Sequence, residues 1–158
     1  MITKELSSNQ TCLFCASDYH LEMILLPYIN KKINNSNFIV LSQTNLTLSI
    51  EKLLNRINID KKVKKKIKNL NWNKTAITEL DNIFINLKDY KTIRNFNYSY
   101  NIIINGDFNY ITKIHNYLKE NISEDMNIID CYHIDDKNID ITTLSEKYHS
   151  ILNTAKIE

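Results

Sequence analysis

The sequence predicts an α/β fold of three layers, in which a mostly parallel sheet carries helices on both faces. Short apolar runs, the length of buried strands, alternate along the chain with longer amphipathic stretches of helical period. Strands that alternate with helices form βαβ units, and such units build parallel sheets. The chain has 158 residues, of which 43% are hydrophobic and 24% charged, and this suits one globular domain over residues 1–158.

The N-terminal part begins with a polar lead over residues 1–10, and the compact apolar run 11–16 then predicts the first strand. Ser17 or Asp18 is expected to cap the next helix, because short polar side chains accept hydrogen bonds from the free amides at a helix start. The apolar spacing that follows is that of an amphipathic helix. Pro27 lies inside this helix and is expected to bend it.

A second strand is predicted over 38–41, because four large apolar residues follow a run of asparagine and serine. Thr44 or Asn45 is expected to cap the helix after it. A lysine-rich helix over 60–70 and a further helix over 76–86 complete this part of the chain.

The C-terminal part starts with residues 88–99, which show no clear pattern. Apolar runs predict a third strand over 100–104 and a fourth over 126–132. The helix between these strands is expected to be capped by Asp107. A closing helix is predicted over 142–153, with its apolar residues turned inward.

The carboxyl ends of the strands are the expected ligand site, since ligands of parallel α/β sheets bind there, where the strand order reverses. The candidate binding residues at these ends are Cys15, Ser17, Asp18, Ser42, Asp107, Tyr132 and His133. Thiol and imidazole groups also carry nucleophilic and acid–base chemistry, so an enzyme with a cysteine–histidine site at this edge is an alternative.

Gly106 is the one glycine of the chain. Loops that bind nucleotide phosphates need several glycines, so their motifs are absent and the familiar nucleotide triphosphatases and dinucleotide oxidoreductases are excluded. Gly106 is instead predicted to occupy a turn that requires a positive φ angle. No cofactor is indicated.

The cysteines predict packing rather than a metal or redox centre. Cys12 and Cys15 are three apart in a strand, so their side chains should lie on opposite faces. Cys131 and His133 share one face and could meet Cys15 or His20 at a zinc ion, but nothing in the spacing brings them together, and no metal site is predicted.

The expected compartment is the cytoplasm. Residues 1–6 lack the apolar core of a signal peptide. No apolar run approaches the roughly 18 residues that a membrane span needs. An odd number of cysteines, three, fits reduced thiols.

Lysines form the one block of like charge, and they are Lys61, Lys62, Lys64, Lys65, Lys66 and Lys68. The plainer interpretation is the solvated face of a helix, and the alternative is contact with nucleic acid or another acidic surface. The formal net charge of +2 gives no overall field toward such partners, and the block holds no aromatic residues for stacking on bases.

Several segments resemble the MEDS sensory domain, a family named for methanogens, methylotrophs and a dichloromethane-response regulator. The strand 11–15, the helix with a proline–aromatic pair at 26–29 and the strand 38–41 are similar to the opening elements of that family. The turn 104–108 and the cysteine–aromatic strand 128–135, with the histidine-bearing segment after it, resemble its later elements.

The resemblance implies a recombinase-like or Rossmann-like topology without the phosphate loop, and a role in bacterial or archaeal signalling through small molecules. The chain departs from the family pattern at two places. Gln10-Thr11 stand where the family often has a histidine, and Asn34-Asn35 stand where it has a glycine.

We therefore expect a non-catalytic sensory or regulatory domain that binds a small ligand or a separate regulatory protein and shifts between conformations. The alternatives are the cysteine–histidine enzyme and a binder of nucleic acid or acidic surfaces, with nucleic acid the least favoured partner. The sequence leaves the oligomeric state and the identity of the ligand open.

Overall fold

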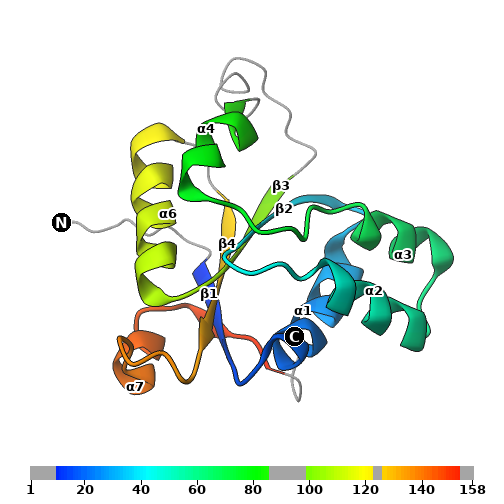
Figure 1. The fold of residues 1–158 in the computed structure, drawn as a ribbon, viewed down its shortest axis with the longest axis horizontal. Coiled ribbons are helices and arrows are strands. Elements are labelled where there is room, and N and C mark those ends of the chain that lie inside the picture. Colours follow the sequence, from blue (N-terminus) through cyan, green and yellow to red (C-terminus); the bar gives the residue numbers. More distant parts are fainter. Residues whose placement is uncertain (1–9, 86–98, 123–125, 154–158) are drawn as a thin grey trace.

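The computed structural model of the chain describes residues 10–85, 99–122 and 126–153. Five strands form one sheet in the order β2-β3-β4-β1-β5, and every neighbouring pair is parallel. Helices cover both faces of the sheet (Figure 1). The predicted three-layer α/β fold, with its Rossmann-like arrangement, is therefore confirmed.

The strands are β1 (Gln10–Cys15), β2 (Ser36–Ser42), β3 (Ser99–Asn105), β4 (Asn127–His133) and β5 (Ser150–Ile151). The first four lie within two residues of their predicted positions. They are continuous apolar runs because helices bury both of their faces.

The helices are α1 (Asp18–Lys32), α2 (Thr47–Arg56), α3 (Lys61–Lys68), α4 (Leu80–Ile83), α6 (Phe108–Asn121) and α7 (Ile141–Ser145), with a 3-10 turn η1 (Ile77–Glu79) before α4. Figure 1 shows α1, α2 and α3 on one side of the sheet and α6 and α7 on the other. Each side has its own apolar cluster. We call these sides the α1 face and the α6 face.

The start of α1 agrees with prediction and the start of α2 does not. The Ser17 hydroxyl accepts a hydrogen bond from the His20 amide at 3.1 Å, and α1 runs on through Pro27. By contrast, the N-cap of α2 is Leu46, which is two residues beyond Thr44 and one beyond Asn45, and the helix begins at Thr47. The Asn45 side chain accepts a hydrogen bond from the Thr47 amide at 2.9 Å and so closes a local turn ahead of the helix.

The predicted closing helix over 142–153 is wrong beyond Ser145. The chain leaves α7 and adds β5 to the outer edge of β1. This pairing supplies backbone hydrogen bonds, buries Leu152 and lets the Tyr148 hydroxyl donate to Asp130. Tertiary contacts of this kind override the local helical spacing.

The helix predicted over 76–86 appears as η1 followed by the short α4, with Leu80 and Phe84 buried as expected. The predictions made for the polar lead up to residue 9 and for the part of the chain between 86 and 98 lie outside the described residues.

The connection after β2 passes from the α1 face to the α6 face. Its helices α2 and α3 pack in the cluster of α1, whereas α4 packs in that of α6. Between them, Lys74 forms a parallel bridge with Ser42, and the Thr75 amide donates to the Ser42 carbonyl at 2.7 Å. The other edge of Ser42 pairs with Asn105 of β3, so this crossing segment lies along the outer edge of β2.

Candidate functional site

Four polar side chains form a row across the carboxyl ends of four neighbouring strands. The register places Cys15 of β1 beside His133 of β4, and Ser42 of β2 beside Asn105 of β3. Side chains alternate between faces along a strand, and these four share the α1 face with the buried residues two positions before them. The sheet topology thus brings together groups that are far apart in the sequence.

Hydrogen bonds join the members of this row. The Cys15 sulfur lies 3.5 Å from His133 Nδ1, and His133 Nε2 lies 2.9 Å from Asn105 Oδ1. Asn105 Nδ2 donates to the Ser42 hydroxyl at 2.9 Å. Since the amide nitrogen of Asn105 faces Ser42, its oxygen must accept from His133. The network therefore assigns the proton to Nε2 and leaves Nδ1 to accept from the thiol.

The Cys15 thiol is fully buried at the end of this row. Burial raises its pKa to about 12, and the nearby carboxylates of Asp18 and Asp135 act in the same direction. The carbonyl of Tyr132, also 3.5 Å from the sulfur, is a second acceptor that competes with His133 Nδ1 for the one thiol proton. The thiol is therefore protonated at neutral pH and is a weak nucleophile in this conformation.

A cleft of about 440 Å³ opens beside the row, at the carboxyl edge of the sheet. Its lining residues are Gln43, Thr44, Asn105, Gly106, Asp107, His133, Asp135, Asp136 and Lys137. The chain turns onto the α1 face after β1 and onto the α6 face after β4, although the two strands are neighbours. Open α/β sheets bind ligands at such a reversal. The cleft borders it only through His133 and the segment after β4, because its other lining residues follow β2 and β3.

Carboxylates of the cleft also hold the start of α6. Asp107 accepts from the Tyr110 amide at 2.8 Å, which confirms it as the helix cap, and Asp136 accepts from the Phe108 amide at 2.9 Å. The Gln43 side chain accepts from the backbone amide of Asp107 at 2.8 Å. Hydrogen bonds thus join three parts of the cleft wall: the residue after β2, the start of α6 and the segment after β4.

Of the predicted binding residues, Asp107 and His133 line the cleft. Cys15 and Ser42 lie behind it, where they contact His133 and Asn105. Asn105 belongs to the strand end 105–107 that is expected at the ligand site, but it is not one of the candidate binding residues.

The other three predicted residues do not line the cleft. Ser17 caps α1, and Asp18 is the first residue of that helix. The Tyr132 side chain lies on the α6 face, where its hydroxyl contacts that of Tyr148 at 2.6 Å.

Gly106 is required for a different reason than predicted. Its φ angle lies outside the left-handed region. A Cβ atom at this position would lie 2.4 Å from Cδ2 of Tyr110 and 2.8 Å from Oε1 of Gln43. The glycine is therefore needed because another side chain packs directly against the backbone.

The cysteines follow the predicted alternation, with Cys12 on the α6 face and Cys15 on the α1 face. All three cysteines are free and buried. Within the described residues, no three side chains of the metal-binding types gather at one point.

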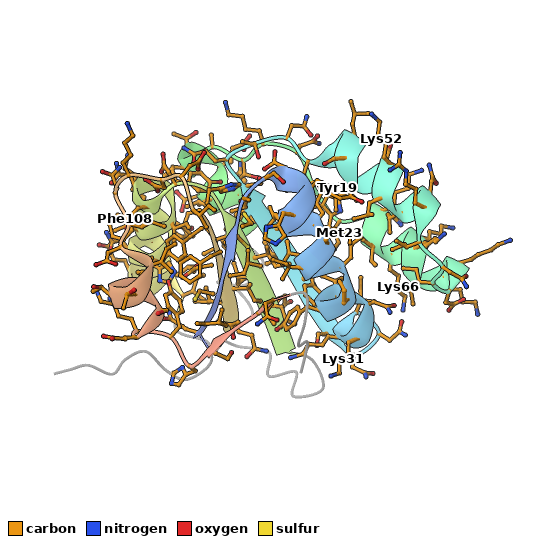
Figure 2. All side chains as sticks on the ribbon, turned by 90° about the horizontal axis from the view of Figure 1, so that it is seen from below. Tyr19, Met23, Lys31, Lys52, Lys66 and Phe108 are labelled. Atoms are coloured by element: carbon orange, nitrogen blue, oxygen red, sulfur yellow. The ribbon has the colours of Figure 1, made fainter. Side chains whose placement is uncertain are left out.

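The lysine block forms α3, as predicted. Val63 and Ile67 are buried, while the six lysines keep their side chains wholly or partly exposed. Lys66 also donates to the Asn34 side chain at 2.7 Å. Figure 2 shows Lys52 and Lys66 on the side of the molecule opposite to Phe108.

Comparison with protein-family models, curated proteins and solved structures gives no match for the chain. The resemblance to the MEDS domain therefore stays a prediction. Among the helices that the structure describes, none has the length and apolar character of a membrane span.

Proposed function

We propose that the chain is a non-catalytic, cytoplasmic sensory or regulatory domain that binds a small polar ligand in the cleft at the carboxyl edge. One observation carries the proposal: the His133 ring lines the cleft and is held on both nitrogens, by Cys15 and by Asn105. A preorganised polar group in a concave site is a common basis of ligand recognition.

The chemistry of the cleft favours polar ligands. Three carboxylates line the cleft, those of Asp107, Asp135 and Asp136. The lining also includes the ammonium group of Lys137, the polar side chains of Gln43 and Thr44, and the His133 ring. The cleft therefore offers hydrogen-bond donors and acceptors, and it contains both negatively and positively charged side chains. A ligand that changes their contacts would act on α6, because two of the carboxylates accept from its first amides.

The state of the thiol argues for binding rather than catalysis. Cys15 is fully buried and its raised pKa keeps it protonated, so it presents no nucleophile to the cleft. Free, buried thiols also fit the reducing cytoplasm.

Thermal denaturation with a panel of nucleotides, small organic acids, small amines and zinc tests the proposal. A compound present at about 100 times its Kd stabilises the folded state by about 2.7 kcal/mol, which a melt detects readily. We expect at least one compound to raise the Tm of the wild-type protein and of the control His149→Gln, whose altered side chain is exposed. The same compound should not raise the Tm of His133→Gln. The proposal fails if no compound acts, or if every effect persists in His133→Gln.

A cysteine hydrolase or transferase is the second candidate, because the row also has the order of a catalytic triad. Cys15 would be the nucleophile, His133 its base and Asn105 the group that orients the base. A catalytic thiol must become exposed and ionised.

Alkylation of the native protein by iodoacetamide at pH 7, followed by mass spectrometry, separates the two candidates. We expect Cys15 to react far more slowly than in the urea-unfolded chain. Modification of Cys15 at the rate of the unfolded chain, abolished in His133→Gln, would support the enzyme and contradict the non-catalytic proposal.

A further inference from the structure

A second polar network lies on the opposite face of β4 and is separate from the cleft. The Asp130 carboxylate is fully buried in the middle of this strand. His115 of α6 contacts both of its oxygens through Nε2, at 2.7 and 2.9 Å, and the Tyr148 hydroxyl donates to Oδ2 at 2.6 Å. A buried carboxylate is costly unless it is paired in this way.

The hydrogens of this network have one consistent arrangement. The Tyr148 hydroxyl donates a hydrogen bond to Asp130. The Tyr148 oxygen therefore accepts from the Tyr132 hydroxyl, which lies 2.6 Å away. Burial, as the largest cause, raises the pKa of both tyrosines, so both stay protonated. The Nε2–H group of His115 donates a hydrogen bond to the Asp130 carboxylate. Its other nitrogen, Nδ1, has no hydrogen-bond partner within the described residues.

A cavity of about 300 Å³ adjoins this network, between α6, β4 and the segment after α7. Its apolar lining is formed by Phe108, Ile111, Tyr132, Leu144 and Tyr148. Its polar lining is formed by Gln10, Thr112, His115, Asn116, Lys119 and Lys147. Figure 2 shows Phe108, which lines the cavity, on the opposite side of the molecule from Lys52 of α2 and Lys66 of α3.

The charges of the cavity have one sign. Lys119 and Lys147 are exposed at its border, and the His115 ring is partly exposed, with 20% of its side chain accessible. Among the described residues no acidic side chain lines the cavity, and the Asp130 carboxylate behind it is already bound by two donors. An anion would therefore meet two ammonium groups and a ring that is able to donate from Nδ1 when protonated.

We infer that this cavity binds a small organic anion with an apolar body, of the class of aromatic carboxylates, as a second ligand site. The carboxylate would face Lys119, Lys147 and the His115 ring, and the apolar body would lie against the aromatic lining. The cavity thus offers polar and cationic groups together with an aromatic wall, and small-molecule sites combine polar groups that fix orientation with an apolar lining. A cationic ligand would face like charges, and a fully polar ligand would leave its groups unpaired against the apolar lining.

Benzoate, with benzamide and benzylamine as neutral and cationic analogues, is a probe for this site. Titration of the isotope-labelled protein is followed by NMR, through the His115 ring and the backbone amides of α6. We expect benzoate to shift the signals of His115, Thr112 and Asn116, and the two analogues to act far more weakly.

The variant Lys119→Gln/Lys147→Gln should weaken benzoate binding by about fivefold, which is the factor expected from losing about 1 kcal/mol of charge interaction. Lys113→Gln is the matched control, because Lys113 lies on the same helix, is exposed and does not line the cavity. The Lys113→Gln protein should bind benzoate with the affinity of the wild type. These surface substitutions leave the core untouched, and thermal melts verify the fold.

The inference is overturned if benzoate leaves His115 unshifted, if benzamide or benzylamine binds as well as benzoate, or if the double variant binds like the control. Shifts that centre on Gly106 and His133 would assign benzoate to the cleft at the carboxyl edge and would also overturn it. The test is independent of the proposed function, because neither network shares a side chain with the other.

Discussion

Glu22 is a buried carboxyl group whose removal should stabilise the protein. It lies on α1 and is fully buried against α2. One of its oxygens accepts from the Ser49 hydroxyl, and within the described residues the other has no hydrogen-bond partner. Burial raises the pKa of this carboxyl above its ordinary value of 4.5.

The sign of the pH dependence follows from that shift. The folded state binds the proton more tightly than the unfolded chain does. The free energy of unfolding therefore falls as the pH rises above 4.5, and it stays lowered above the raised pKa. The cost of the charged group is therefore absent below pH 4.5 and grows as the pH rises through the raised pKa.

The substitution Glu22→Met removes the unpaired oxygen at nearly constant volume. Ser49 keeps a partner, because its one hydroxyl proton is then free to bind the Leu46 carbonyl, which lies 3.3 Å away. An unsatisfied buried group costs about 1–3 kcal/mol, and each kcal/mol shifts the Tm of a domain of this size by about 2–4 °C. We therefore expect a Tm higher by about 2–12 °C at pH 7.5, and a smaller gain at pH 4.

Thermal melts followed by circular dichroism between pH 4 and pH 8 measure this effect. Glu120→Met is the matched control, because Glu120 is exposed on α6 and should show no such pH-dependent gain. A Glu22→Met protein with the stability and the pH dependence of the wild type would refute the reasoning.

Three further substitutions test how the fold is held together, each by urea denaturation. Gly106→Ala should cost about 1–3 kcal/mol, because the new methyl group collides with the Tyr110 ring; an unchanged midpoint would mean that the ring moves aside freely. Trp72→Phe should cost about 1–3 kcal/mol, since it removes the indole donor that binds the buried Ile67 carbonyl at 2.8 Å; a smaller loss would show that water replaces it. Ser17→Ala should cost about 1 kcal/mol through loss of the α1 cap, and equal losses in Ser17→Asp, which can still cap, would contradict that explanation.

The strands were predictable because burial in the sheet produces a simple hydrophobic pattern in the sequence. Both faces of a parallel sheet are covered, so each strand appears as an unbroken apolar run. The alternation of side chains then placed Cys12 and Cys15 on opposite faces, as the structure has them. Neither conclusion depends on which strands are neighbours.

Three members of the polar row, Cys15, Ser42 and His133, were predicted at this edge, but the contacts within the row depend on the strand order and could not be predicted. Cys15 meets His133 only because β1 lies beside β4, and Asn105 meets Ser42 only because β3 lies beside β2. Periodicity along a single segment holds no information about which other segment pairs with it.

One residue of the sequence, Asp130, could have indicated the second network, but it was not among the predicted site residues. A carboxylate in the middle of an apolar strand, buried on both faces, requires a partner. Its partners come from α6 and from the segment after α7. That last segment was predicted to be part of a helix, and a helix there would have placed Tyr148 differently.

The crossing segment beside β2 has a consequence for the behaviour of the protein at high concentration. An edge strand with open amide and carbonyl groups can recruit a strand from another molecule and so begin aggregation. Here Lys74 and Thr75 occupy the outer side of Ser42 and shield the end of that edge. The same few residues that carry the chain between the two layers of helices thus close the carboxyl end of this edge to a strand from another molecule.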